Sequence, residues 1–164
     1  VWLTVLGGLL SMIFCMSAAA QPAALSDGAR DALIKSQVET AVSMLAAIHA
    51  RQQKGEMRAD QARKLATGLL RELRYGKEGY FWADTTEGVN VVLYGRKDTE
   101  GRNRLADRDA KGVLYVKEFL ARGKTGGYVE YLFTKKGEAA PLPKRSYVLL
   151  FKPFGWVVGT GYYR

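Results

Sequence analysis

The spacing of apolar residues changes from a helical to a strand-like pattern at Gly76, and this change limits the possible folds. Between residues 30 and 52, apolar side chains recur at intervals of four and three, at Ile34, Val38, Ala41, Leu45 and Ile48. A second run with similar spacing occupies residues 62–73. Such intervals place apolar side chains on one face of an α-helix. We therefore predict two helices, the second ending where Gly76 can adopt a left-handed backbone conformation.

After Gly76 the chain is rich in aromatic and β-branched residues separated by turn residues, which is typical of strands. Strand-like segments occur at residues 79–84, 90–94, 128–133, 145–151 and 156–162. Residues 95–109 are polar and predict a long loop, and residues 113–120 predict one short helix. This order of elements predicts an α+β fold, with a five-stranded antiparallel sheet and helices packed on one side of it.

The first 26 residues carry no charge. Residues 1–16 are strongly apolar, and with their Ser/Ala continuation they reach the ~20 residues that cross a hydrocarbon core. Two interpretations of residues 1–26 are open: a transmembrane anchor, or a signal segment cleaved after the small residues at positions 18–20. Both place the remaining chain outside the cytoplasm. Because the sequence begins at Val1, we expect a piece of a longer protein.

The formal net charge is +9, from 25 Lys and Arg against 16 Asp and Glu. A basic balance favours acidic partners: nucleic acid, anionic lipid or an anionic small molecule. The basic residues are scattered, with no run of five, and the export predicted above argues against nucleic acid. We therefore expect no nucleic-acid partner, and an anionic lipid surface is the weaker alternative to a small anion.

The inventory of reactive residues argues against an enzyme. The chain has one cysteine, Cys15, and one histidine, His49, which excludes an internal disulfide, a thiolate zinc site and c-type haem attachment. There is no Gly-x-Ser-x-Gly motif, and Gly159-x-Gly161 lacks the third glycine of a nucleotide loop. Asp107 and Asp109 are expected to be turn and cap residues. We predict no catalytic residue, no metal and no cofactor.

The narrow apolar stripe of the first helix has two open interpretations. Its four-and-three spacing suits packing along a second copy of the same helix, which predicts a homodimer through the N-terminal helix. The same stripe equally suits packing against the body of its own domain, and both interpretations can hold on different faces.

Six short motifs occur in an order that resembles one known family, the single Cache sensor domain of bacterial chemoreceptors and other transmembrane receptors. The resemblance runs from about Ala41 to Tyr162, and each motif is weak alone. The motifs are Arg74-Tyr75-Gly76, Gly79-Tyr80-Phe81-Trp82, Asp109-x-x-Gly112, Gly127-Tyr128-Val129-x-Tyr131, Lys144-x-x-Tyr147 and Gly155-Trp156-Val157-Val158-Gly159-Thr160-Gly161-Tyr162.

The resemblance implies a PAS-like sheet on a long, dimer-supporting helix, with a short carboxylate such as acetate, propionate or pyruvate held between sheet and loop. Together with the apolar N-terminal segment, it divides the chain into a transmembrane anchor or signal segment (1–26), a long N-terminal helix (27–56) and a PAS-like single Cache sensor domain (57–164). Many members carry Met-His-Pro in the second strand, where this chain has Val92-Leu93-Tyr94. The pocket histidine of those members is therefore absent, and two consequences are open: a different ligand, or a polar group supplied by Tyr94 instead. The alternative is a non-sensing dimerisation or protein-interaction module.

A carboxylate in a partly desolvated pocket needs fixed hydrogen-bond donors. Arg, Lys, Tyr and Trp supply them with different geometries. We predict a ligand site formed by Arg74, Trp82, Tyr131, Lys144 and Tyr147, with Tyr80 and Tyr94 as outer candidates. Strand alternation places Tyr80 and Trp82 on one face. Alternatives are that Arg74 caps the second helix, that Lys144 is a solvated turn residue after Pro143, and that Trp82 is plain core.

Overall fold

A five-stranded antiparallel sheet in the order β4-β3-β7-β6-β5 forms the centre of the fold in the computed structural model. The strands are β3 (Trp82–Thr85), β4 (Asn90–Leu93), β5 (Gly127–Thr134), β6 (Pro141–Phe151) and β7 (Trp156–Tyr163). The structure describes residues 25–164, and the predicted anchor or signal segment lies almost entirely outside them. No helix within residues 25–164 is long and apolar enough to cross a membrane. The predicted α+β class and five-stranded sheet are confirmed.

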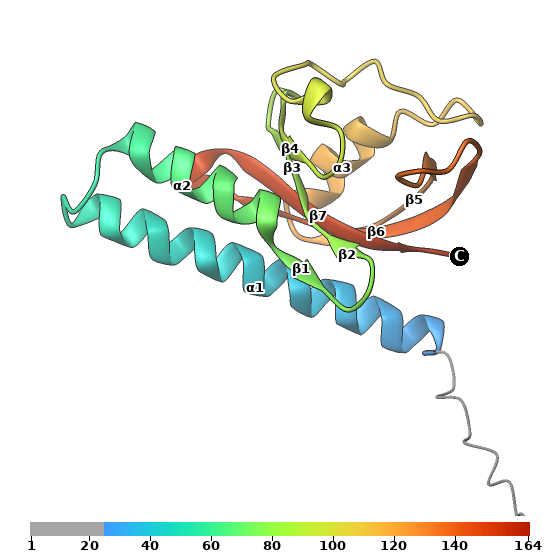
Figure 1. The fold of residues 1–164 in the computed structure, drawn as a ribbon, viewed down its shortest axis with the longest axis horizontal. Coiled ribbons are helices and arrows are strands. Elements are labelled where there is room, and N and C mark those ends of the chain that lie inside the picture. The colour runs from blue at the N-terminus through green and yellow to red at the C-terminus, as the bar shows by residue number, and fades with distance from the viewer. Residues whose placement is uncertain (1–24) are drawn as a thin grey trace, which may run out of the picture.

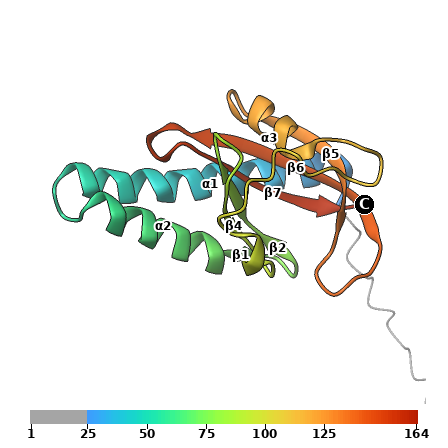
Figure 2. The same cartoon turned by 90° about the horizontal axis from the view of Figure 1, so that it is seen from above.

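Two helices, α1 (Asp27–Gln53) and α2 (Ala59–Glu72), cover one face of the sheet. In Figures 1 and 2 they run side by side, with α1 beneath the sheet. The stripe predicted from the sequence is buried against this face: its five residues, Ile34 to Ile48, are each at most 5% exposed. The structure thus shows the stripe packed against the body of its own domain.

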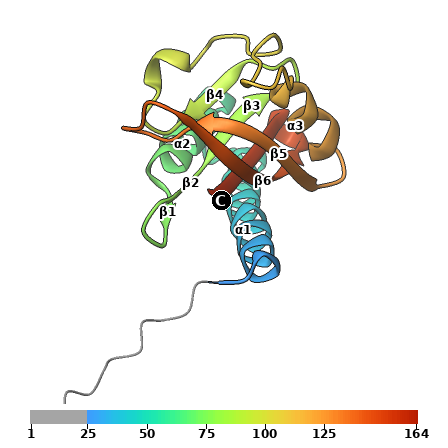
Figure 3. The same cartoon turned by 90° about the vertical axis from the view of Figure 1, so that its right-hand side faces the viewer.

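The third helix, α3 (Tyr115–Gly123), lies on the opposite face, together with the long loop that contains the short 3-10 helix η1 (Lys97–Thr99). Figure 3 shows α1 and α3 on opposite sides of the sheet. The expectation that all helices pack on one side is therefore wrong for α3. The reason is that alternate residues of the central strands are apolar on both faces, as with Trp82 and Ala83, so both faces must be covered.

The segment after α2 differs from the prediction at Gly76. Helix α2 ends at Glu72, and Gly76 turns a two-stranded hairpin formed by β1 (Arg74–Tyr75) and β2 (Gly79–Tyr80). Its φ of +54° is the left-handed conformation expected for it, but it serves this turn and not the helix end. Arg74 caps the helix instead, because its guanidinium donates to the carbonyls of Arg71 and Leu73 at 2.7 Å.

An ionic cluster attaches the start of α1 to the sheet. The Arg145 guanidinium on β6 donates to both carboxylate oxygens of Asp31 on α1, and the shortest contact to each oxygen is 2.8 Å. The Tyr162 hydroxyl on β7 donates to the same carboxylate at 3.0 Å. The hydrogen bonds from Arg145 hold the pKa of Asp31 below its usual value, against the opposing effect of burial. Charge-assisted, bidentate bonds of this kind fix orientation as well as adding stability.

We predict that Asp31→Asn lowers the free energy of unfolding at neutral pH by about 1 kcal/mol, a modest loss because solvent partly screens the cluster. Because the carboxylate's folded pKa is lowered, its contribution is present above the ordinary value of 3.8 and is lost as the pH falls through the folded pKa. Urea denaturation at neutral pH and well below pH 3.8 measures both effects. Asp98→Asn, which changes an exposed carboxylate that has no ion pair among residues 25–164, is the control and should leave the midpoint unchanged.

Candidate ligand site

A closed cavity lies between the sheet and the layer formed by α3 and the long loop, and we call it the inner cavity. Side chains from β3, β4, the loop, α3, β5 and β6 line it: Trp82, Leu93, Arg104, Phe119, Tyr131, Phe133 and Lys144. Its empty space totals about 180 Å³, spread so thinly that no point holds a water-sized sphere. The lining side chains must therefore move apart to admit a ligand.

Arg104 enters the inner cavity from the long loop as half of a buried ion pair. Its guanidinium donates to both carboxylate oxygens of Asp84, at 3.0 and 3.2 Å, and both side chains are buried. Asn90 donates to the same carboxylate at 2.9 Å. Burial acts against the charge of Arg104, but the Asp84 carboxylate, together with Tyr115 and Tyr131, raises the pKa of the guanidinium above its ordinary value. The sequence analysis missed Arg104, because nothing local distinguishes it from the other arginines of the loop.

Lys144 is a buried cation without a carboxylate partner in the described part of the chain. Its side chain is 2% exposed, and its Nζ donates to the Tyr80 hydroxyl at 2.6 Å. The ammonium lies 4.4 to 5.1 Å from the ring centroids of Tyr80, Tyr163 and Phe133. Burial, and then the positive charges of Arg104 and Arg96, lower its pKa to about 7. The alternative of a solvated turn residue is wrong, because β6 carries Lys144 into the interior.

Trp82, which lines the inner cavity, has an unused hydrogen-bond donor. Its indole lies between Phe119, with ring centroids 4.3 Å apart, and the backbone of Gly159. The buried Nε1 has no hydrogen-bond partner within residues 25–164, and the same is true of Arg104 Nε, although Asp107 lies 3.5 Å from it. A buried donor left unsatisfied costs ~1–3 kcal/mol, so both groups are ready to bind an acceptor.

The structure brings together four of the seven predicted site residues. Trp82, Tyr131 and Lys144 line the inner cavity, and Tyr80 contacts it through Lys144. The Tyr131 hydroxyl is 3.1 Å from Ser146 Oγ, so this tyrosine already has one partner.

The other three predicted residues lie elsewhere. Tyr147 is on the opposite face, against Ile34 and Val38 of α1, because side chains alternate along β6. Arg74 stands 3.7 Å above the ring of Tyr94, outside the inner cavity. Tyr94 lines a separate cavity beside Tyr80.

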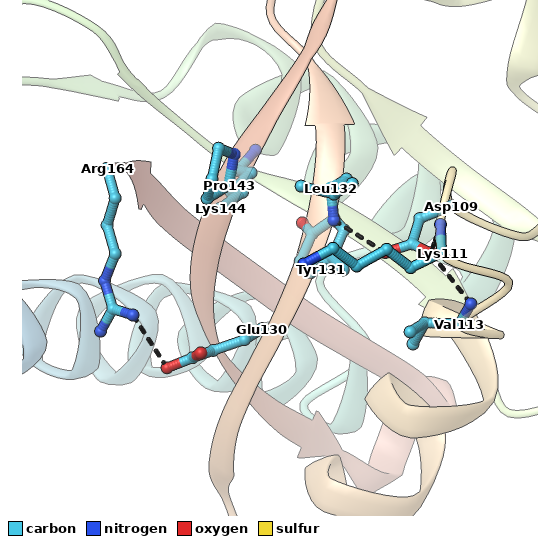
Figure 4. A pocket seen from close by; sticks show the side chains of 9 residues that line it. All are labelled: Asp109, Lys111, Val113, Glu130, Tyr131, Leu132, Pro143, Lys144 and Arg164. Atoms are coloured by element: carbon cyan, nitrogen blue, oxygen red, sulfur yellow. Dashed lines mark hydrogen bonds and ion pairs between the residues drawn. The ribbon is translucent and has the colours of Figure 1, made fainter.

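A wider hollow at the β5 edge, shown in Figure 4, also borders Tyr131 and Lys144, but its two carboxylates and Arg164 are already bound. The Asp109 carboxylate accepts hydrogen bonds from the backbone N–H groups of Lys111, Val113 and Leu132 at 2.8 to 2.9 Å. Glu130 binds two arginines, one of them Arg164. Asp109 thus fastens the loop to β5, and the expected turn and cap role is what the structure shows for it.

The chain belongs to the family described as Single Cache domain 2, whose model matches residues 26–164. This agrees with the resemblance found in the sequence motifs. The solved structures that it is similar to include a periplasmic sensor domain of a chemotaxis protein, with 38% identity and a TM-score of 0.78, covering 82% of this chain and 94% of that one. Another is a Cache chemosensory domain whose title describes carboxylic acid recognition, with 30% identity, a TM-score of 0.79 and coverage of 83% and 94%.

Among curated proteins, the chain is 32% identical over 129 residues to the methyl-accepting chemotaxis protein McpP of Pseudomonas putida, covering 77% of this chain and 24% of McpP. It is also 32% identical over 105 residues to the sensor histidine kinase MctS of Rhizobium johnstonii, covering 63% of this chain and 23% of MctS. The chain therefore spans about a quarter of the length of these relatives. A chemoreceptor and a sensor kinase thus both contain a segment similar to this domain.

We predict that Gly159→Ala disrupts the inner cavity, because an added methyl group would overlap the Trp82 indole. The indole must then leave its place between Phe119 and β7, which near-ultraviolet circular dichroism and tryptophan fluorescence detect. Gly68→Ala is the control: this glycine lies in α2 with open space around it, so alanine should stabilise the protein by about 0.5–1 kcal/mol. Unchanged Trp82 spectra in Gly159→Ala would contradict the packing described here.

We predict that Lys144→Met stabilises the protein, most strongly at and below neutral pH. The folded pKa of about 7 lies below the ordinary 10.5, so the unfolded state binds more protons between these values. The stability of the parent should therefore rise with pH from 7 towards 10.5, and Lys144→Met should remove this rise. Thermal unfolding across this pH range measures it. A parent and variant with parallel pH profiles would show that Lys144 is not buried as a strained cation.

Proposed function

We propose that this domain is the extracytoplasmic sensor of a bacterial transmembrane receptor and that its inner cavity binds a small organic acid such as acetate, propionate or pyruvate. The observation that carries the proposal is the buried Lys144 ammonium, which lines the cavity without a carboxylate partner among the described residues. The other cation of the cavity, Arg104, is paired with Asp84 and lies 3.5 Å from Asp107. One monocarboxylate would supply the missing partner of Lys144.

The unused donors favour the same class of ligand. A carboxylate has two oxygens that accept several hydrogen bonds, and the buried N–H groups of Trp82 and Arg104 lack acceptors. The Lys144 ammonium can exchange its bond to the Tyr80 hydroxyl for a stronger, charge-assisted bond to the ligand. Each of these contacts gains more from an anion than from a neutral molecule of the same size.

The size of the cavity favours a short ligand. As it stands, no point of the cavity holds a water-sized sphere, so movement of the lining side chains must create all the room that a ligand needs. The aromatic rings of Phe119 and Phe133 complete the wall and exclude water from an alkyl group. A short carboxylate requires less of this movement than a longer one.

The relatives support the setting of the proposal. McpP and MctS are receptors or sensor kinases by name, and one similar structure is a periplasmic sensor domain. We place this domain on the periplasmic side of the cytoplasmic membrane, attached by residues 1–26 and followed by an output module that acts in the cytoplasm. Ligand binding, and not catalysis, is the activity proposed for it.

A homodimer through α1 stays a prediction. The stripe that first indicated it is buried in the domain's own core, so such a dimer has to use the exposed face of α1. Sedimentation of the domain with and without ligand tests this. The alternative function, a dimerisation or protein-interaction module without a ligand, predicts a dimer that binds no small molecule.

The test is a calorimetric titration of the domain with acetate, propionate, pyruvate and a set of amino acids. We expect saturable binding of a short carboxylate, lost in Lys144→Met because the variant cannot pair with the anion. Lys144→Met is a fair test, since it should fold at least as stably as the parent. Tyr147→Phe is the matched control and should bind normally, because Tyr147 faces α1. Binding that survives in Lys144→Met would place the site elsewhere.

The pH dependence of the affinity is a second readout of the same titration. Without ligand the pKa of Lys144 is about 7, so above this pH the amine must take up a proton to pair with the anion. Affinity should then fall as the pH rises above 7, by up to about tenfold for each pH unit. If no acid in the set binds at any pH, the result favours the alternative function, a dimerisation or protein-interaction module.

A further inference from the structure

A second cavity, which we call the outer cavity, adjoins the inner one. It lies between the β1–β2 turn, the residues after β4 and the β5–β6 turn, and it is open to solvent with an empty volume of about 670 Å³. Four aromatic side chains form much of its wall: Tyr80, Tyr94, Phe133 and Tyr163. Of these, Phe133 also lines the inner cavity, so the two spaces share a wall.

The outer cavity carries an excess of positive charge. Lys77, Arg96, Lys135 and Lys136 line it, against the single carboxylate of Glu78. Glu78 binds Lys135 at 2.6 Å. The other three basic groups have no ion-pair partner among residues 25–164, and residues 1–24 contain no Asp or Glu. A concave surface with uncompensated charge of one sign raises the local concentration of counter-ions.

Contacts within the wall hold two of these cations at the cavity. The Arg96 guanidinium donates to the carbonyl of Thr134 at 3.1 Å and stands 5.2 Å from the ring centroid of Phe133. The Lys136 ammonium lies 4.8 Å from the ring centroid of Tyr94, and its stem crosses Gly95, where a Cβ atom would overlap it. These side chains are thus placed over aromatic rings and not extended freely into solvent.

The shared wall leads directly to Lys144. Its Nζ contacts the Tyr80 hydroxyl at 2.6 Å and lies beside the rings of Phe133 and Tyr163, all three of which line the outer cavity. A displacement of Tyr80 would open the inner cavity to the outer one at the ammonium itself. The hollow of Figure 4 also borders Lys144, but its Glu130 and Asp109 carboxylates offset the positive charges of Lys111 and Arg164.

We propose that the outer cavity is a weak anion-binding site from which a carboxylate passes to Lys144 by displacing Tyr80. The inference rests on the proposed function of the inner cavity and adds the route and the first contact. The basic residues accelerate capture, and the aromatic wall closes behind the ligand. The affinity of the inner site and the rate of reaching it are then set by different residues.

The first experiment measures propionate association by stopped-flow tryptophan fluorescence at low and high salt. The double variant Lys77→Glu/Lys136→Glu should lower the association rate constant about tenfold at low salt, with less effect at high salt and little change in dissociation. Lys54→Glu/Lys64→Glu makes the same change of net charge on exposed residues of the α1–α2 end and should bind at the parent rate. Equal rates in all three proteins, or equal losses in both variants, would overturn the proposal.

The second experiment separates this proposal from the function of the inner cavity. Lys144→Met, which disables the inner site, is titrated with propionate at low salt while backbone amide shifts are followed by NMR. We expect weak, salt-sensitive shifts at Lys77, Arg96 and Lys136, absent after Lys77→Glu/Lys136→Glu. A lack of these shifts refutes the outer site even where the parent binds propionate. Shifts in the outer cavity, with no inner binding in the parent, retain the outer site and refute the proposed function.

Discussion

The buried ion pair between Arg104 and Asp84 holds the long loop against the sheet, and the inner cavity depends on it. Few residues of that loop are large and apolar; Leu105, which packs over Gly88, is one. Hydrophobic burial alone therefore gives little to fix the loop in place. The guanidinium reaches Asp84 at the sheet, and the Asp109 carboxylate fastens the loop's far end to β5. Removing either partner of a buried pair is strongly destabilising, so these contacts define the cover of the site.

The inner cavity and the attachment of α1 lie back to back on the same two strands. Lys144 faces the cavity, and the next residue, Arg145, faces α1 and binds Asp31. On β5, Tyr131 likewise faces the cavity, and its neighbour Glu130 binds Arg145 on the other face. Strand alternation makes this unavoidable, because successive side chains point to opposite faces. A ligand bound at Lys144 is therefore one residue away from the contact that orients the N-terminal helix.

The cavity lowers the stability of the fold. A lysine buried without a carboxylate, and indole and guanidinium N–H groups without acceptors, each cost free energy that a well-packed apolar site would not. Functional sites commonly retain such strain because the ligand relieves it. The same groups that weaken the free domain are those that an anion would satisfy.

The sequence by itself determined the elements and the family. Apolar spacing predicted α1, α2 and five strands, because periodicity reports which face of an element is buried. Motif order identified the Cache family, and Trp82, Tyr131 and Lys144 came from those motifs. The tertiary structure decided what spacing does not carry: that α3 covers the second face, that Tyr147 points to α1, and that Arg74 caps a helix. It also placed Arg104 of the long loop beside Asp84. The sequence did not predict this ion pair, because two residues far apart in the chain form it and leave no local pattern.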